Sequence, residues 1–493
     1  MIFYFFVLVF FLNTRDFFLD EGAHGMDSLF FYKFLQNPTI HIKDFVFRFY
    51  SYYPALFLNE YPPLIHVIAS IFYLIFGPSE FISRLVISLI SIAALFAVYL
   101  FGKKMFDEET GIEASLLISV IPYYFTFSQL FMMEIPMVFL FTLSTYLFFK
   151  NKNPFLLGLV LALNFYTKFL SVIFFGVIGL YTIWSKTLSK NFFYLLKTGL
   201  IFVILTAPFL VFLYTQTGMV FSLNQIKGEE NFVDVIFWEA KMDFLKNTKL
   251  IQLLYFPYHL LYYIPIFILT LCFLGLSSMN DQKKFLVSWI VFFLLTFTIL
   301  PNKTPKYIIY VFPPIAILAA HGFQKIKFKQ KKLFVIGFIL LSLMLLILNP
   351  LNPDADIKQG YERIGSKQLS EYIESSISDN ATVFVMNKES YNIIFGFAKN
   401  NDFENKVIRS VNCKFENISE SEFRSFIRRN NVQFIIGSEN DPIYIKLSSF
   451  LNRLQIVKDY GYLKVFRNDN IDLRKMPKVC NYNCFVNLEF CED

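Results

Sequence analysis

Long apolar runs separated by short loops dominate the first 350 residues and restrict the chain to one broad class of fold. A helix that crosses a bilayer needs about 20 predominantly apolar residues. Suitable runs lie at 81–102, 112–130, 134–149, 155–184 (a close pair hinged at Lys168), 193–214, 253–276, 285–301, 307–321 and 333–349. With 55% hydrophobic and only 17% charged residues, the chain is predicted to be a polytopic α-helical membrane protein.

The basic residues predict which side of the membrane each loop occupies. The loop KIKFKQKK at 325–332 is the most basic in the chain and should be cytoplasmic. Counting backwards from it places further lysine pairs on the same side: 103 and 104, 150 and 152, 186 and 190, 283 and 284. The net charge of +7 therefore reflects cytoplasmic loops, and we expect no nucleic-acid partner.

The apolar run 61–77 is predicted to lie in the outer membrane interface rather than to cross. Only then do Asp20 and the residues before 81 both fall outside, within one external loop from 13 to 80. Residues 1–12 lack the basic start and small-residue cleavage site of a signal peptide, so we expect a retained anchor. The count gives about eleven transmembrane helices in the cell (plasma) membrane, with the N-terminus cytoplasmic.

The composition becomes polar after about residue 350. SKQLSEYIESSI and SESEFRSFIRR have helical periodicity, whereas ATVFVMN, VQFIIGS and YLKVFRN read as short buried strands. We therefore expect a membrane domain over 1–349, with a second large external loop at 215–252. A C-terminal extracytoplasmic α/β domain is expected over 350–493.

Four cysteines lie in the expected extracytoplasmic domain: Cys413, Cys480, Cys484 and Cys491. An oxidising compartment favours disulfides among them, with the pairing left open. Zinc is the alternative, and it is disfavoured because no histidine follows His321. Asn380 and Asn417 begin glycosylation sequons on the same side.

Charged residues collect at helix ends on the predicted outer face. They are Asp20, Glu21, Glu60, Arg84, Glu134, Lys168, Lys303 and Lys306. A charge within a membrane segment costs roughly 2.5–3.5 kcal/mol on insertion scales, so such residues pair or line a cavity; snorkelling of helix-end lysines is the alternative. Acids and cations together suit transfer of a sugar from a lipid phosphate. A carboxylate takes the proton of the acceptor hydroxyl, and cations offset the charge of the departing phosphate.

Several ordered motifs carry a resemblance to a known family. They are LDEGAHG, LNEYPPLIHVIASIFYLIFGPSEFISRL, QLFMMEIPMVFLF, LNFYTKFL and NKTPKYIIYVFPPIAILAA. Over about residues 15–325 the chain resembles the GT-C superfamily, in the branch of the protein O-mannosyltransferases and the aminoarabinose (ArnT-like) transferases that modify lipid A. The resemblance implies an inverting glycosyltransferase (EC 2.4 class) that uses a dolichyl or undecaprenyl phosphate sugar, with Asp20 as catalytic base and Glu21 as its neighbour.

The resemblance also implies roles for other residues. The donor phosphate would be bound by Lys303, Lys306, Tyr307, Arg15, Arg84 and Lys168. Glu60 and Glu134 would be supporting acids. A divalent metal is not required, although Glu60 and His259 could hold one. Tyr61 stands where the aminoarabinose branch has a phosphate-contacting lysine. The expected partners are the lipid-linked donor, the bilayer, and a glycan, lipid or protein hydroxyl as acceptor.

Two other classes of function compete with this interpretation. A polytopic transporter or flippase of a lipid-linked substrate would also carry charges within the membrane, but such proteins tend to show paired repeats with broken helices near the midplane. The sequence shows no such repeat, and its charges collect at one face. A membrane-anchored scaffold would leave the acids and cations unexplained.

Overall fold

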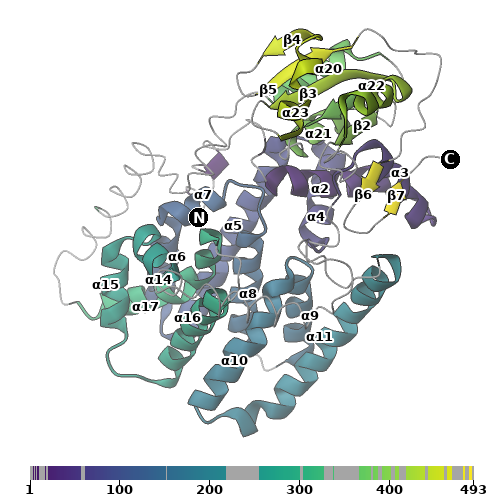
Figure 1. Ribbon diagram of the computed structural model, residues 1–493. Helices are drawn as coiled ribbons and strands as arrows, with labels where there is room; N and C mark the ends of the chain where they lie inside the picture. The colour runs from purple at the N-terminus through teal and green to yellow at the C-terminus, as the bar shows by residue number, and fades with distance from the viewer. Residues whose placement is uncertain are drawn as a thin grey trace. The chain divides into compact units, whose positions relative to one another are not determined.

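The chain is represented by a computed structural model (Figure 1). It describes residues 20–56, 61–150, 153–217, 255–299, 304–326, 366–378, 381–386, 391–400, 406–409, 418–438, 442–459, 463–468, 481–483 and 488–490, with single residues 4, 6, 8, 9, 17 and 337. The chain forms two compact units, each described here by itself. Unit 1 comprises Met1–Leu12, Asn59–Ile65 and Arg84–Asp354, and unit 2 comprises Asn13–Leu58, His66–Ser83 and Ala355–Asp493.

All the secondary-structure elements described in unit 1 are helices. Its elements are α5 (Glu80–Met105, whose first turn belongs to unit 2), α6 (Glu108–Ser119), α7 (Pro122–Phe127), α8 (Glu134–Lys150), α9 (Pro154–Phe165), η1 (Phe169–Val172), α10 (Ile173–Trp184), α11 (Leu188–Thr217), α14 (Tyr255–Tyr263), α15 (Ile266–Gly275), α16 (Asp281–Ile299), η2 (Pro305–Val311) and α17 (Phe312–Gln324). As predicted, Lys168 marks a break, here between α9 and η1.

Four described helical segments are long and apolar enough to cross a membrane: Glu80–Met105, Leu188–Phe212, Asp281–Ile299 and Pro305–Gln324. The pair α14 and α15 would make a fifth if it is one span, although it bends by 107°. Residues 1–12 and the run 333–349 are described only at single positions. The expected number of about eleven transmembrane helices therefore stays a prediction.

Two predicted continuous helices are broken by proline. The run 112–130 divides into α6 and α7, with Pro122 at the start of α7. The run 253–276 divides at Pro265 into α14 and α15. Proline has no N–H to donate within a helix and disfavours helical geometry in the residue before it, so a new helix begins at each site.

An aromatic core holds the helices of unit 1 together. The Trp289 ring of α16 lies with its centroid 4.8 Å from that of Phe141 in α8 and 6.2 Å from that of Phe101 in α5. All three side chains are buried. At the pair α15 and α17, Gly275 and Gly322 lie directly against the partner backbone, leaving no room for a Cβ. Small residues at such crossings let membrane helices approach closely.

Unit 2 combines a mixed sheet with helices from both ends of the chain. Its helices are α2 (Asp20–Gln36), α3 (Ile42–Tyr52), α4 (Leu64–Phe76, whose first two residues belong to unit 1), α20 (Ser366–Ser376), α21 (Tyr391–Ala398), α22 (Glu420–Arg429) and α23 (Pro442–Leu451). Its strands are β1 (Thr382–Val385), β2 (Lys406–Arg409), β3 (Val432–Ser438), β4 (Gln455–Asp459), β5 (Leu463–Arg467), β6 (Asn481–Asn483) and β7 (Leu488–Phe490).

The five-stranded sheet has the order β2-β1-β3-β5-β4. β1 pairs in parallel with β2 and β3, whereas β5 runs antiparallel to β3 and β4. β3 is the central strand, and its residues VQFIIG are all buried. A strand covered on both faces typically has such a nearly continuous apolar sequence. β4 is mostly exposed and bears Lys458, as suits an edge strand. β6 and β7 form a separate antiparallel pair.

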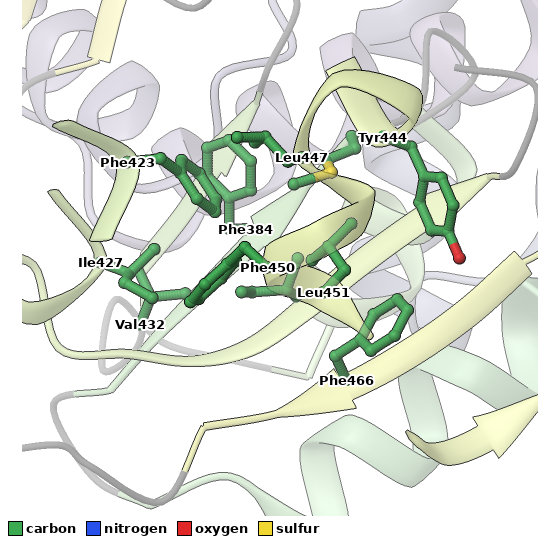
Figure 2. Close-up of a cluster of buried hydrophobic side chains, with 11 residues drawn as sticks. Phe384, Phe423, Ile427, Val432, Tyr444, Leu447, Phe450, Leu451 and Phe466 are labelled. Carbon is green, nitrogen blue, oxygen red and sulfur yellow. The ribbon is translucent and has the colours of Figure 1, made fainter. Parts of the chain in front are cut away.

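A cluster of buried side chains joins the sheet to its helices (Figure 2). Phe384 of β1 meets Phe423 of α22 at 5.2 Å between ring centroids, and Phe423 meets Phe450 of α23 at 5.7 Å. A capping box between Ser419 and Glu422 fixes the start of α22. The strands predicted at ATVFVMN, VQFIIGS and YLKVFRN are present as β1, β3 and β5.

Helix α2 has two distinct faces. Gly22 lies against Asn392 and Gly25 against Phe395, so the glycine face packs closely on α21. Asp20, His24 and Asp27 follow one another at spacings of four and three residues, which places them together on another face. The glycines thus fix α2 on the C-terminal part of unit 2 while its acidic face is directed elsewhere.

Candidate functional site

A buried ion pair lies at the start of α8 in unit 1. Lys168 Nζ donates a hydrogen bond of 2.7 Å to Glu134 Oε1. The side chains are only 12% and 1% exposed, respectively. Glu134 is the first residue of α8, and Lys168 ends the short link between α9 and η1. Each charge is expensive to bury alone, so the pair explains how both are tolerated.

Two tyrosines of η2 complete this group. Lys168 Nζ donates a second hydrogen bond, of 3.3 Å, to the hydroxyl of Tyr310. The same ammonium lies 5.4 Å from the ring centroid of Tyr307 and 6.0 Å from that of Tyr310, within cation–π range. Tyr307 stacks on Phe297 of α16 at 4.4 Å. We refer to Glu134, Lys168, Tyr307 and Tyr310 as the lysine–tyrosine cluster.

The other residues predicted for unit 1 have different surroundings. Lys306 is partly buried in η2 beside Tyr307, and Arg84 is buried in α5. His259 lies among tyrosine rings, with its centroid 4.3 Å from that of Tyr255 and 5.4 Å from that of Tyr263. Within the described ranges, no three His, Cys, Asp or Glu residues are grouped so as to hold a metal ion. We therefore derive no step through a metal.

Some predicted residues lie outside the described part of the chain. They are Arg15, Glu60, Lys303, Cys413, Cys480, Cys484 and Cys491. The roles expected for them stay predictions.

The predicted catalytic acids begin α2 in unit 2. Asp20 and Glu21 occupy the first turn, where carboxylates stabilise a helix through its dipole. Glu21 is fully buried, whereas Asp20 is partly exposed. The partial exposure of Asp20 is the property that a group meeting a substrate requires.

A chain of buried polar groups lies on the acidic face of α2. His24 Nδ1 is 3.1 Å from Nε2 of His66 in α4, and His66 Nδ1 is 4.0 Å from Asp27 Oδ2. All three residues are almost completely buried. Burial, and secondarily the neighbouring His24, holds the pKa of His66 well below its usual value. The two imidazoles can therefore share a hydrogen bond in which one ring donates and the other accepts.

Sequence reasoning did not single out His24, Asp27 or His66. The spacing of Asp20, His24 and Asp27 was a readable signal, because it places them on one helix face. The partner His66 is 42 residues further along the chain than His24, and nothing in the local pattern connects the two.

Residues 60–212 match the protein family described as dolichyl-phosphate-mannose-protein mannosyltransferase. This segment contains both Glu134 and Lys168. The crystal structure of ArnT from Cupriavidus metallidurans in the apo state superposes with a TM-score of 0.64 at 12% identity, covering 95% of this chain and 96% of ArnT. The chain therefore shares the fold of ArnT, as its resemblance to the GT-C superfamily predicts.

Two other solved structures share this fold. The Cupriavidus metallidurans ArnT structure bound to undecaprenyl phosphate gives a TM-score of 0.63 at 10% identity, covering 94% of this chain and 96% of that one. The archaeal oligosaccharyltransferase AglB from Archaeoglobus fulgidus, with an inhibitory peptide and a dolichol-phosphate, gives 0.51 at 14% identity, covering 94% and 72%.

An uncharacterized protein of Aquifex aeolicus is 27% identical over 337 residues, which cover 66% of this chain and 72% of that protein. The fold shared with ArnT and the long apolar helices together indicate a membrane protein.

Proposed function

We propose that this chain is a membrane glycosyltransferase that moves a sugar from a polyprenyl phosphate to an acceptor hydroxyl. The observation that carries the proposal is the lysine–tyrosine cluster on a GT-C fold, since Glu134 and Lys168 fall within the segment that matches the mannosyltransferase family. The ArnT structure with undecaprenyl phosphate supports a polyprenyl phosphate as the donor class.

In the proposed reaction the acceptor oxygen attacks the anomeric carbon of the sugar. The bond from that carbon to the phosphate oxygen breaks on the opposite side, so the configuration inverts. The Asp20 carboxylate takes the acceptor proton, and the polyprenyl phosphate leaves with the bonding electron pair. A well-placed general base typically contributes about 10²–10⁴ in rate. Glu21, which is fully buried in the first turn of α2, would fix the position of that turn and so of the neighbouring Asp20.

The cations would act on the leaving phosphate. An ammonium has three N–H donors, and in the described part of unit 1 Lys168 directs one to Glu134 and one to Tyr310. A phosphate oxygen would accept the third. Lys306, beside Tyr307, would add a second positive charge, and Lys303, Arg84 and Arg15 are further candidates. Such preset charges stabilise the negative charge that develops on the leaving group.

We also propose an extracytoplasmic face for the reaction and for the C-terminal region, because every predicted basic loop then lies inside. Disulfides among Cys413, Cys480, Cys484 and Cys491, with the pairing open, offer a specific test of that side. Mass spectrometry of peptides from non-reduced protein purified from membranes would find a cross-link among them, and free thiols at all four positions would exclude one.

The direct test of the function is donor consumption. Purified protein in nanodiscs would be incubated with dolichyl- and undecaprenyl-phosphate sugars and a mixture of acceptor glycans, lipids and peptides, and the products identified by mass spectrometry. We expect release of the free polyprenyl phosphate and a glycosylated acceptor. Movement of an intact lipid-linked sugar across a vesicle bilayer, without cleavage, would instead establish the flippase alternative.

A further inference from the structure

A polar cavity lies between the end of α2 and the start of α3 in unit 2. Its volume is about 410 Å³, and it is lined by Lys33, Asn37, Thr39, His41, Asp44, Phe45 and Arg48. Small-molecule sites occupy roughly 300–1,000 Å³, so the cavity has room for a phosphate with an attached sugar or glycerol.

The charges around this cavity favour an anion. Lys33, His41 and Arg48 are basic residues, and Asp44 is the single carboxylate among the lining residues. Lys33 is only 4% exposed, so its position is set by the fold rather than by solvent. Asp44 is 81% exposed and lies 3.9 Å from His41, at the outer edge of the group.

Aromatic packing holds the walls of the cavity in place. The Phe45 ring of α3 lies 5.3 Å from Phe30 and 5.4 Å from Phe34 of α2, measured between ring centroids. Phe49, one turn further along α3, lies 5.3 Å from Phe30. Because these contacts hold α2 and α3 together, the backbone positions that carry Lys33 and Arg48 keep their spacing without a ligand, which reduces the ordering required when one binds.

We propose that this cavity is a binding site for a phosphate-bearing group, held by Lys33 and Arg48. Lys33 follows Asp20 by 13 residues on one helix, which separates the two by about 20 Å along its axis. A group held here would thus be remote from the proposed catalytic base. It could belong to a soluble sugar phosphate or to a phospholipid headgroup, and binding to the cavity does not require the proposed transferase activity.

Two binding measurements on the full-length protein distinguish these sources. Isothermal titration in nanodiscs of zwitterionic lipid would use glucose 1-phosphate, and native mass spectrometry would compare bound phosphatidylglycerol with bound phosphatidylcholine. We expect binding in at least one arm. Arg48→Gln should weaken it about tenfold, since it removes a charged hydrogen-bond donor. Asp44→Asn should strengthen it about two- to fivefold by removing the competing carboxylate.

Arg428→Gln is the matched control, since Arg428 is an exposed arginine of α22 in the same unit and does not line the cavity. It should leave binding unchanged. If Arg48→Gln fails to fold, the exposed Asp44→Asn still decides the matter by the direction of its effect. Absence of binding in both arms, or binding that Asp44→Asn does not strengthen, would overturn the proposal.

Discussion

Glu134 in unit 1 and Asp27 in unit 2 are both almost fully buried acids, but their basic neighbours differ in kind. Glu134 receives a 2.7 Å hydrogen bond from the side-chain ammonium of a lysine. Asp27 lies 4.0 Å from a histidine that is held neutral by burial and by a second histidine. The unit 1 site therefore holds an ammonium group in place, whereas the unit 2 site is built from imidazole and carboxylate groups that can exchange protons.

This difference assigns different tasks to the two regions. A fixed ammonium with a tyrosine hydroxyl and two aromatic faces suits the binding of an anionic group such as a phosphate. A helix that starts with two carboxylates and has a histidine pair one turn away suits the acceptance of a proton. We therefore expect changes in α2 to affect turnover and changes in the lysine–tyrosine cluster to affect donor binding.

The largest effect is expected at Asp20. Asp20→Asn should lower kcat by about 10²–10⁴, because the acceptor hydroxyl loses its base, while KM for the polyprenyl-phosphate sugar changes little. Steady-state kinetics with a single donor measures the split. Asp459→Asn, at an exposed position of β4, is the matched control and should behave as wild type. Near-normal kcat in Asp20→Asn would remove the proposed base.

A second test breaks the buried ion pair. Lys168→Met leaves Glu134 charged in a buried site, so we expect a loss of about 3–5 kcal/mol in stability, together with a raised KM for the donor. The double variant Glu134→Gln, Lys168→Met should recover a large part of the lost stability, since neither buried charge remains. Thermal unfolding in detergent compares the wild type, each single variant and the double variant. Strictly additive losses would show that the two residues do not interact.

The histidine pair predicts a pH dependence of stability. Because the pKa of His66 is lowered by folding, the unfolded chain binds the proton more readily below its ordinary value of about 6.5. Stability should therefore fall as the pH drops below about 6.5, and His66→Gln should flatten that fall. Denaturation midpoints from pH 7.5 to pH 5 provide the comparison. An equally steep fall in the variant would assign the dependence to other groups.

The smallest effect is expected at Tyr310. Tyr310→Phe removes one acceptor from Lys168 but keeps the aromatic face, so the expected loss of stability is about 0.5–1.5 kcal/mol. The donor KM should rise less than in Lys168→Met. A larger effect than that of Lys168→Met would mean that the hydroxyl, rather than the ammonium, organises the cluster.

The sequence predicted much of the local structure because local patterns determine it. The strands at 382–385, 432–438 and 463–467 and the break at Lys168 all follow from short apolar runs and their interruptions. Glu134 and Lys168 were both selected as candidate site residues from their places at helix ends. Their mutual contact was not predicted, since 34 residues separate them and only the packing of α8 against α9 and η2 joins them.

Long-range pairings account for the other differences. The His24–His66 contact and the docking of α2 on α21 both join segments that are distant in sequence. The splits at Pro122 and Pro265 were missed because overall hydrophobicity was given more weight than the proline within each run. Compact unit 2 likewise groups Asn13–Leu58 with the C-terminal region, an association that no local pattern signals.

We propose that the α2 carboxylates and the lysine–tyrosine cluster act in the same sugar-transfer reaction. A cryo-electron microscopy structure of the protein in nanodiscs with undecaprenyl phosphate tests this most directly. We expect phosphate density in contact with Lys168 or Lys306, with the Asp20 carboxylate no further away than the span of one sugar ring. Phosphate bound elsewhere, or Asp20 on the opposite side of the membrane from Lys168, would contradict it.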